Sequence, residues 1–259
     1  MSRTLRKVLL IVLILVFAAA AFLYIREQAP YMKNKSVYRE ASENYTAPNK
    51  NASEGPSEDP SGSDEVSGLK APITVDFEAL KAVNSDIQGW IYCEGTAIDY
   101  PVLKGETDDS YIHTDYRGEY DFAGAIFVEA LDLDDFGDAN TIVYGHSMKD
   151  GSMFYVLRRW RSQSFADEHP YIWLLTPECD YRIEVFGAYV TEDGSDVYTI
   201  FREGGQQLLD YVNKAQKRSV IKTGVSLDAD SKYILLSTCS RDNSDERTVV
   251  HGKMVPVRK

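Results

Sequence analysis

The hydrophobic pattern divides the chain into three parts. Residues 8–25 form a continuous apolar run without a charged or strongly polar side chain. Residues 26–70 are rich in Ser, Glu, Asn, Pro and Lys and poor in aliphatic residues. From residue 71 to 259, short apolar and aromatic runs alternate with polar turn clusters. The pattern predicts an apolar helix, a linker and one domain of about 190 residues, an ordinary size for a domain.

The apolar run is close to the shortest length that crosses a bilayer as a helix. Arg3, Arg6 and Lys7 precede it, and positive charges stay on the cytoplasmic side. We therefore expect residues 1–7 to be cytoplasmic and residues 8–25 to be a transmembrane signal anchor. A cleaved signal peptide is the alternative, but the small residues 18–21 lie inside the run and not after it, which favours an uncleaved anchor.

The polar segment 26–70 has few residues that could enter a core. Such a composition buries too little apolar surface to offset the entropy lost on ordering. The sequence therefore predicts a flexible extracellular stalk over residues 26–70.

The remaining domain has the pattern of a β-protein with added helices. Its short β-branched and aromatic runs, separated by turn residues, are typical of a sandwich or barrel. Eight strands are predicted, at residues 89–93, 97–103, 124–128, 141–144, 171–175, 181–191, 232–239 and 247–251. Three helices are predicted, at residues 76–83, 152–161 and 203–217, the last with its apolar residues at helical spacing.

Charge and cysteine content narrow the function. The chain has 40 acidic and 28 basic residues, a formal net charge of −12, and its only basic cluster is Arg158, Arg159 and Arg161. This distribution argues against binding to nucleic acid, which needs a basic face. The three cysteines are an odd number, which in an exported chain suggests a free reactive thiol. No zinc spacing is present, and no metal or cofactor is predicted.

Cys239 is the candidate nucleophile. It ends the run 232–239, and Arg247 opens the next run after seven polar residues, which is the pattern of a hairpin. A hairpin would set the thiol and the guanidinium on neighbouring strands, where opposed Cβ atoms lie roughly 5 Å apart. A cysteine becomes a useful nucleophile when positive charge is near, although a lone cysteine is also often buried and inert.

His146 is the candidate proton carrier. It lies just past the strand 141–144, after Gly145, which permits a tight bend. Histidine is the usual partner of a catalytic thiol because it takes and returns a proton near neutral pH. The other three histidines, His113, His169 and His251, are predicted to lie on a surface loop, in a polar turn and in a strand.

One acidic segment suggests a calcium site. Residues 132–138 include four aspartates, but Phe136 occupies a position where an EF-hand needs an oxygen ligand. A solvated acidic turn is therefore predicted there.

Several segments resemble the sortases, and class B in particular. The segments YGHSMKDGSMF (144–154), LSTC (236–239) and RTVV (247–250) resemble the His, Cys and Arg motifs of that class. GWI (89–91), IDYPV (98–102) and AGAIF (123–127) are also similar. The resemblance extends from about residue 76 to the C-terminus, with the motifs in the family's order. Ser147 departs from the pattern, because class B often has Asn beside the catalytic histidine.

The resemblance implies a mainly β fold, a closed eight-stranded sortase-type β-barrel with an N-terminal helix and a helix between strands 6 and 7. Residues 71–259 would be the catalytic domain, outside a cell membrane that the chain crosses once. The implied activity is that of a membrane-anchored cysteine transpeptidase of a Gram-positive bacterium. It would cleave an NPxTN- or SPxTG-like C-terminal sorting signal after Thr, through a thioester, and transfer the secreted protein to a cell-wall amine of peptidoglycan or lipid II.

By the same resemblance, Cys239, His146 and Arg247 would be catalytic, while Ser237 and Thr238 would line the substrate groove. Two alternatives remain. One is a sortase that polymerises pilins, and the other is a catalytically inactive, anchored binding module.

Overall fold

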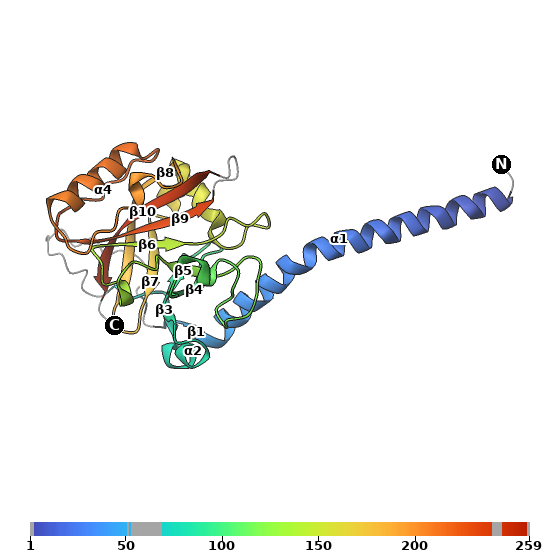
Figure 1. Ribbon diagram of the computed structural model, residues 1–259, viewed down its shortest axis with the longest axis horizontal. Helices are drawn as coiled ribbons and strands as arrows, with labels where there is room; N and C mark the ends of the chain where they lie inside the picture. The colour runs from blue at the N-terminus through green and yellow to red at the C-terminus, as the bar shows by residue number, and fades with distance from the viewer. Residues whose placement is uncertain (1–2, 51, 53–68, 240–244, 258–259) are drawn as a thin grey trace.

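Eight strands form a closed barrel, which confirms the predicted fold. The computed structural model describes residues 3–50, 52, 69–239 and 245–257. The strands follow one another around the barrel in the order β10-β8-β7-β3-β4-β5-β6-β9 (Figure 1). They are β3 (Ile87–Tyr92), β4 (Asp99–Leu103), β5 (Ile126–Val128), β6 (Asn140–Tyr144), β7 (Tyr171–Leu175), β8 (Asp180–Glu192), β9 (Lys232–Cys239) and β10 (Glu246–Val257).

The pairing of the strands decides which residues meet at each end of the barrel. β4 pairs with β5 and β6 pairs with β9 in parallel, whereas the other neighbours are antiparallel. Parallel strands leave the sheet at the same edge. The chain therefore emerges from β6 and from β9 at one end of the barrel.

The apolar run of β9 is buried on both of its faces. Ile234 and Leu236 belong to the cluster that fills the barrel, and Tyr233 and Leu235 belong to a second cluster outside it. Successive strand residues point to opposite faces, so a strand covered on both sides is apolar at every position. The outer cover is α4 (Gln206–Arg218), which contributes Leu208, Val212 and Ala215 and is the predicted helix between strands 6 and 7.

Both shorter predicted helices form, one as an α-helix and the other as a 3₁₀ helix. α2 (Phe77–Val83) begins at Asp76, whose Oδ1 accepts a hydrogen bond from the Ala79 N–H at 3.0 Å. Residues 152–161 were predicted as a helix that starts at Ser152. That start is wrong, because the Ser152 hydroxyl donates to Asp150, and a 3₁₀ helix, η3 (Phe154–Arg161), follows. The remaining short helices are η1 (Asp108–Tyr111), η2 (Asp134–Phe136), α3 (Gln163–Glu168) and η4 (Asp196–Tyr198).

The acidic turn at residues 132–138 is not solvated throughout, contrary to the prediction. The side chains of Asp132 and Asp138 are buried. Asp132 accepts from the Ile142 N–H at 2.7 Å, and Asp138 pairs with Arg202 at 2.9 Å. These carboxylates hold the turn against β6. Among the described residues, no group of three or more His, Cys, Asp or Glu side chains is placed to hold a metal ion.

The N-terminal helix α1 (Arg3–Tyr45) contains the apolar run and extends far from the barrel (Figure 1). Its apolar window is exposed, and the helix is long and apolar enough to cross a membrane. This fits a single-pass membrane anchor.

The predicted flexible stalk is wrong for residues 26–48. α1 continues to Tyr45 and buries one face, Asn34, Val37, Tyr38 and Ala41, against the barrel domain. β1 (Thr46–Pro48) then pairs with β2 (Ile73–Val75). The buried positions recur at helical spacing, a signal that the average composition of the segment conceals. Residues 51 and 53–68 of the predicted stalk lie outside the described residues.

Candidate active site

β6, β9 and β10 bring the three predicted catalytic positions to one end of the barrel. Tyr144 of β6 pairs with Ser237 of β9, and the Gly145 N–H extends the pairing by donating to the Ser237 carbonyl at 3.1 Å. His146 and Cys239 each follow two residues after this last pair. The backbone of Cys239 lies opposite Arg247 of β10. The side chain of Cys239 lies outside the described part of the structure, so its place rests on this register.

Gly145 lets the chain turn from β6 into the site. A Cβ atom at this position would lie 2.4 Å from the Ile126 side chain and 2.8 Å from that of Phe154. No larger residue fits there without displacing the core. The bend is closed by the Phe154 N–H, which donates to the His146 carbonyl at 2.9 Å.

The ring of His146 is oriented by a backbone carbonyl. Its Nε2 lies 2.9 Å from the oxygen of Ile112. A carbonyl oxygen can only accept, so the neutral ring carries its hydrogen on Nε2 and keeps the lone pair on Nδ1. Burial lowers the pKa of His146, and His113 lowers it further, while the bond to Ile112 opposes the change. His146 is therefore neutral at neutral pH, with Nδ1 ready to accept a proton.

His113 is a member of the site that the sequence analysis left on a surface loop. It is exposed, but its ring stacks on that of His146 with 5.7 Å between centroids and 16° between planes. Its Nδ1 lies 3.2 Å from the Phe122 carbonyl oxygen. No local pattern around His113 indicates this contact, because it joins residues that are 33 positions apart.

Arg247 is held by an acidic partner that the sequence did not indicate. One guanidinium nitrogen, Nη2, lies 2.7 Å from Asp193 Oδ2, and Nη1 donates to the Glu246 carbonyl at 3.2 Å. Asp193 follows the end of β8, and its N–H donates to the Asp245 carbonyl at 2.8 Å. The ion pair therefore ties the start of β10 to the loop after β8.

A pocket of about 360 Å³ joins these groups. Both predicted groove residues, Ser237 and Thr238, line it together with His146 and Arg247. The hydroxyl groups of Ser237 and Tyr198 lie 2.9 Å apart, and Ser237 and Thr238 are both buried. The other lining residues are Asp108, Ile112, Phe127, Tyr144, Gly145 and Asp193.

One wall of the pocket is acidic. The Tyr144 hydroxyl donates to Glu129 at 2.8 Å, and the Tyr144 ring stacks on that of Tyr198. Burial raises the pKa of Glu129, and the neighbouring Asp108 raises it further. The pocket thus combines a neutral histidine, one arginine and the carboxylates of Asp108 and Asp193, while Glu129, with its raised pKa, bonds to the Tyr144 hydroxyl from outside the lining.

Most of the barrel domain is similar to known proteins of one family. The profile of the sortase domain family matches residues 91–255. Sortase B of Listeria monocytogenes is 34% identical over 194 residues, which cover 73% of this chain and 78% of that protein. Sortase B of Staphylococcus aureus is 33% identical over 183 residues, 70% of this chain and 75% of that protein.

The chain belongs to the sortase family, in class B. Its fold matches a solved sortase B of Bacillus anthracis with a TM-score of 0.71 at 29% identity, over 88% of this chain and 99% of that one. It also matches a Staphylococcus aureus sortase B–substrate complex with a TM-score of 0.67 at 33% identity, over 70% of this chain and 85% of that one. This sortase is a sorting-signal transpeptidase. Such an enzyme cuts the sorting signal of a protein and transfers that protein to an amine.

Proposed function

We propose that Cys239 is the nucleophile, His146 the proton carrier and Arg247 the electrostatic stabiliser of this sortase. The observation that carries the proposal is the register that sets Arg247 opposite Cys239 while β6 delivers His146 to the same end. Ser237 and Thr238 would line the groove for the signal peptide. This assignment is supported by the pocket, which is lined by His146, Arg247, Ser237 and Thr238.

In the first half of the reaction, the thiol of Cys239 gives its proton to Nδ1 of His146, and the resulting thiolate attacks the carbonyl carbon of Thr in the sorting signal. The C–N bond then breaks, a thioester forms, and protonated His146 gives its proton to the leaving amine. Arg247 carries a permanent charge and donates hydrogen bonds to the oxyanion or to substrate carbonyls.

In the second half, an amine attacks the thioester and loses a proton to Nδ1 of His146. The C–S bond breaks, and Cys239 leaves as the thiolate. We propose that the amine belongs to the cell wall, from peptidoglycan or lipid II, and that the signal is of the NPxTN or SPxTG type. A similar sortase B has been solved in complex with triglycine, a peptide with a free amine, which supports an amine acceptor for this class.

The proposed topology places residues 1–7 in the cytoplasm and the barrel outside. Arg3, Arg6 and Lys7 before the apolar run support this orientation, because positive residues flank the cytoplasmic end of an anchor. Protease added to intact cells would digest an exposed barrel and leave a tag at residue 1 protected.

The catalytic assignment is tested with the full chain in a neutral detergent. Quenched peptides with Asn-Pro-x-Thr-Asn and Ser-Pro-x-Thr-Gly cores are incubated with and without triglycine, and the products are identified by mass spectrometry. We expect cleavage after Thr and triglycine joined to Thr, both absent in Cys239→Ala. A free Thr carboxylate in the presence of triglycine would instead indicate a hydrolase, and cleavage by Cys239→Ala would refute the assignment.

A further inference from the structure

The arginines of the barrel domain fall into two groups. Among the described residues from 71 to 257, five arginines have a carboxylate partner, at 2.5–2.9 Å. These pairs are Arg117–Asp115, Arg182–Glu184, Arg202–Asp138, Arg218–Asp196 and Arg247–Asp193. The other three, Arg158, Arg159 and Arg161, form no ion pair with any described residue, and all three lie on η3. Among the described residues of the barrel domain, the arginines without a carboxylate partner are thus gathered on one short helix, in a chain with a net charge of −12.

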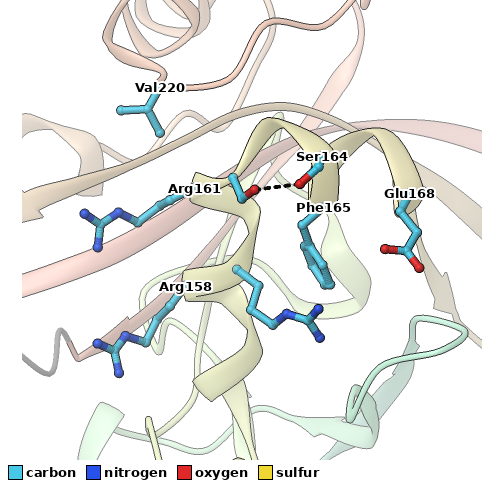
Figure 2. Close-up of a pocket in the computed structure, with 8 residues that line it drawn as sticks. Arg158, Arg161, Ser164, Phe165, Glu168 and Val220 are labelled. Atoms are coloured by element: carbon cyan, nitrogen blue, oxygen red, sulfur yellow. Dashed lines mark hydrogen bonds between the residues drawn. The ribbon is translucent and has the colours of Figure 1, made fainter.

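The 3₁₀ geometry of η3 places two of these arginines in line. A 3₁₀ helix has three residues per turn, so side chains at i and i+3 eclipse each other. Arg158 and Arg161 accordingly extend to the same side of the helix (Figure 2). Like charges at this spacing repel each other. The pair therefore costs stability unless an anion lies between or beside the two guanidinium groups.

The remaining contacts hold these side chains without neutralising them. The Arg159 guanidinium lies over the Phe165 ring at 4.1 Å, and that of Arg158 lies 5.3 Å from the centre of the Tyr155 ring. The Nε of Arg158 is buried and has no hydrogen-bond partner among the described residues. A buried donor without a partner is costly.

A hollow of about 510 Å³ lies beside the three arginines. Ser162 and Ser164 line it, with their hydroxyl oxygens 2.9 Å apart. Between these two serines, Gln163 binds the backbone N–H and carbonyl of Lys222, at 2.8 and 2.9 Å. Glu168 is the acidic residue in the lining of the hollow. Its Oε2 lies 4.0 Å from Nε2 of His169.

We propose that Arg158, Arg159 and Arg161, the η3 basic face, bind phosphate groups of a soluble polyanion. A guanidinium fork pairs with two oxygens, so one carboxylate is satisfied by a single arginine. A phosphate group has more oxygens and can bridge two guanidinium groups, which is the arrangement that the aligned pair offers. Repeating phosphates would also reach Arg159, which lines the same hollow. This site is separate from the catalytic pocket and does not depend on the proposed catalytic roles.

The anchor geometry favours a soluble polyanion over membrane lipid. Residue Asn34 is the first buried position of α1, nine residues after the apolar run, which is about 14 Å of helix. The charge of a lipid surface is screened within about 8–10 Å at physiological salt. α1 also projects away from the barrel (Figure 1), so it acts as a spacer between the barrel and the headgroups.

The face lies on the same segment as the catalytic histidine. η3 starts at Phe154, which is bonded to the His146 carbonyl, and Arg158 is about 8 Å further along the helix. A phosphate polymer bound by the face would therefore be held by the segment that directly follows His146 in the chain.

The test uses the full chain in nanodiscs of neutral phosphatidylcholine and linear inorganic polyphosphate as the probe. We expect binding that weakens as salt rises, and a loss of at least tenfold in affinity in Arg158→Gln/Arg161→Gln. Arg39→Gln, an exposed arginine on α1, is the matched control and should bind like the wild type. Equal binding by the double variant, or equally tight binding of poly-glutamate at matched charge, would overturn the proposal.

Two further measurements keep the result decisive. Arg161→Gln should unfold at a higher temperature than the wild type at low salt without polyphosphate, since it removes a repulsion, and this also shows that the variant folds. Adding phosphatidylglycerol to the nanodiscs should leave the affinity ratio between wild type and double variant unchanged. If that ratio falls to one, lipid headgroups occupy the face, and the assignment to a soluble polyanion is wrong.

Discussion

Arg247 pairs with Cys239 at the last position of the β9–β10 ladder. The guanidinium therefore starts from the backbone position opposite the proposed nucleophile. Asp193, in the loop after β8, binds it at 2.7 Å. The guanidinium of Arg247 thus brings one permanent charge to the site. Asp193 orients this group, and Asp193 can be substituted without changing the thiol.

Arg247→Lys should keep the charge but lose the planar fork. We expect kcat for peptide cleavage to fall about 100- to 1,000-fold, the usual cost of removing an oxyanion donor. Alkylation of Cys239 by iodoacetamide should change much less, because a positive charge still favours the thiolate. A variant with normal kcat would show that the guanidinium does not act on the substrate.

Asp193→Asn should release Arg247 while leaving the fold intact. Exposed ion pairs contribute about 0–1 kcal/mol, so the melting temperature should hardly move. A less well-oriented guanidinium should lower kcat/KM by about threefold to tenfold, which follows from roughly 1 kcal/mol of lost orientation. Glu43→Gln, which removes the exposed carboxylate that pairs with Arg39, is the control and should leave both quantities unchanged.

The acid limb of the pH–activity profile should lie below the ordinary histidine value of about 6.5. Burial lowers the pKa of His146, so the ring stays neutral to a lower pH than an ordinary histidine does. His113→Gln should move the pKa of His146 upward, since the His113 charge is one of the causes that lower it. Titration of isotope-labelled histidine by NMR measures both values directly. A limb above 6.5 in the wild type would contradict the burial argument.

Asp132→Asn should stabilise the protein at high pH and not at low pH. Burial, with Asp138 and Glu129 nearby, raises the pKa of Asp132 to about 7. A carboxyl with a raised folded pKa favours the folded state when protonated, so its cost appears as pH rises from about 4 to 7. We expect a higher melting temperature at pH 8, by roughly 2–4 °C for each kcal/mol gained, and little change at pH 4. Differential scanning calorimetry at both pH values measures the effect.

Tyr38→Phe tests whether α1 is part of the folded domain. The buried Tyr38 hydroxyl donates to the Gly124 carbonyl at 2.6 Å, and its loss leaves that oxygen without this donor. We expect a loss of about 1–3 kcal/mol in the free energy of unfolding. Tyr120→Phe removes a hydroxyl from a largely exposed ring and should have no effect. If both variants melt like the wild type, the packing of α1 contributes little to the stability of the folded domain.

The chain's local patterns predicted the strands of the barrel and the candidate reactive residues. Strand 171–175 appears with the predicted bounds, and strand 232–239 likewise ends at Cys239. Gly145 marked the bend that carries His146, and the spacing from Cys239 to Arg247 indicated the hairpin. These signals are local, because strand alternation, turn residues and hairpin spacing act over a few neighbouring residues.

Tertiary structure alone decided which distant residues contact these side chains. The parallel pairing of β6 and β9 brings together residues that are more than 90 positions apart, and Asp193 reaches Arg247 across 54. The stacking of His113 on His146 arises in the same way, across 33 positions. Such contacts depend on barrel closure, which brings distant segments together, and a contact between distant segments leaves no periodic trace in either of them.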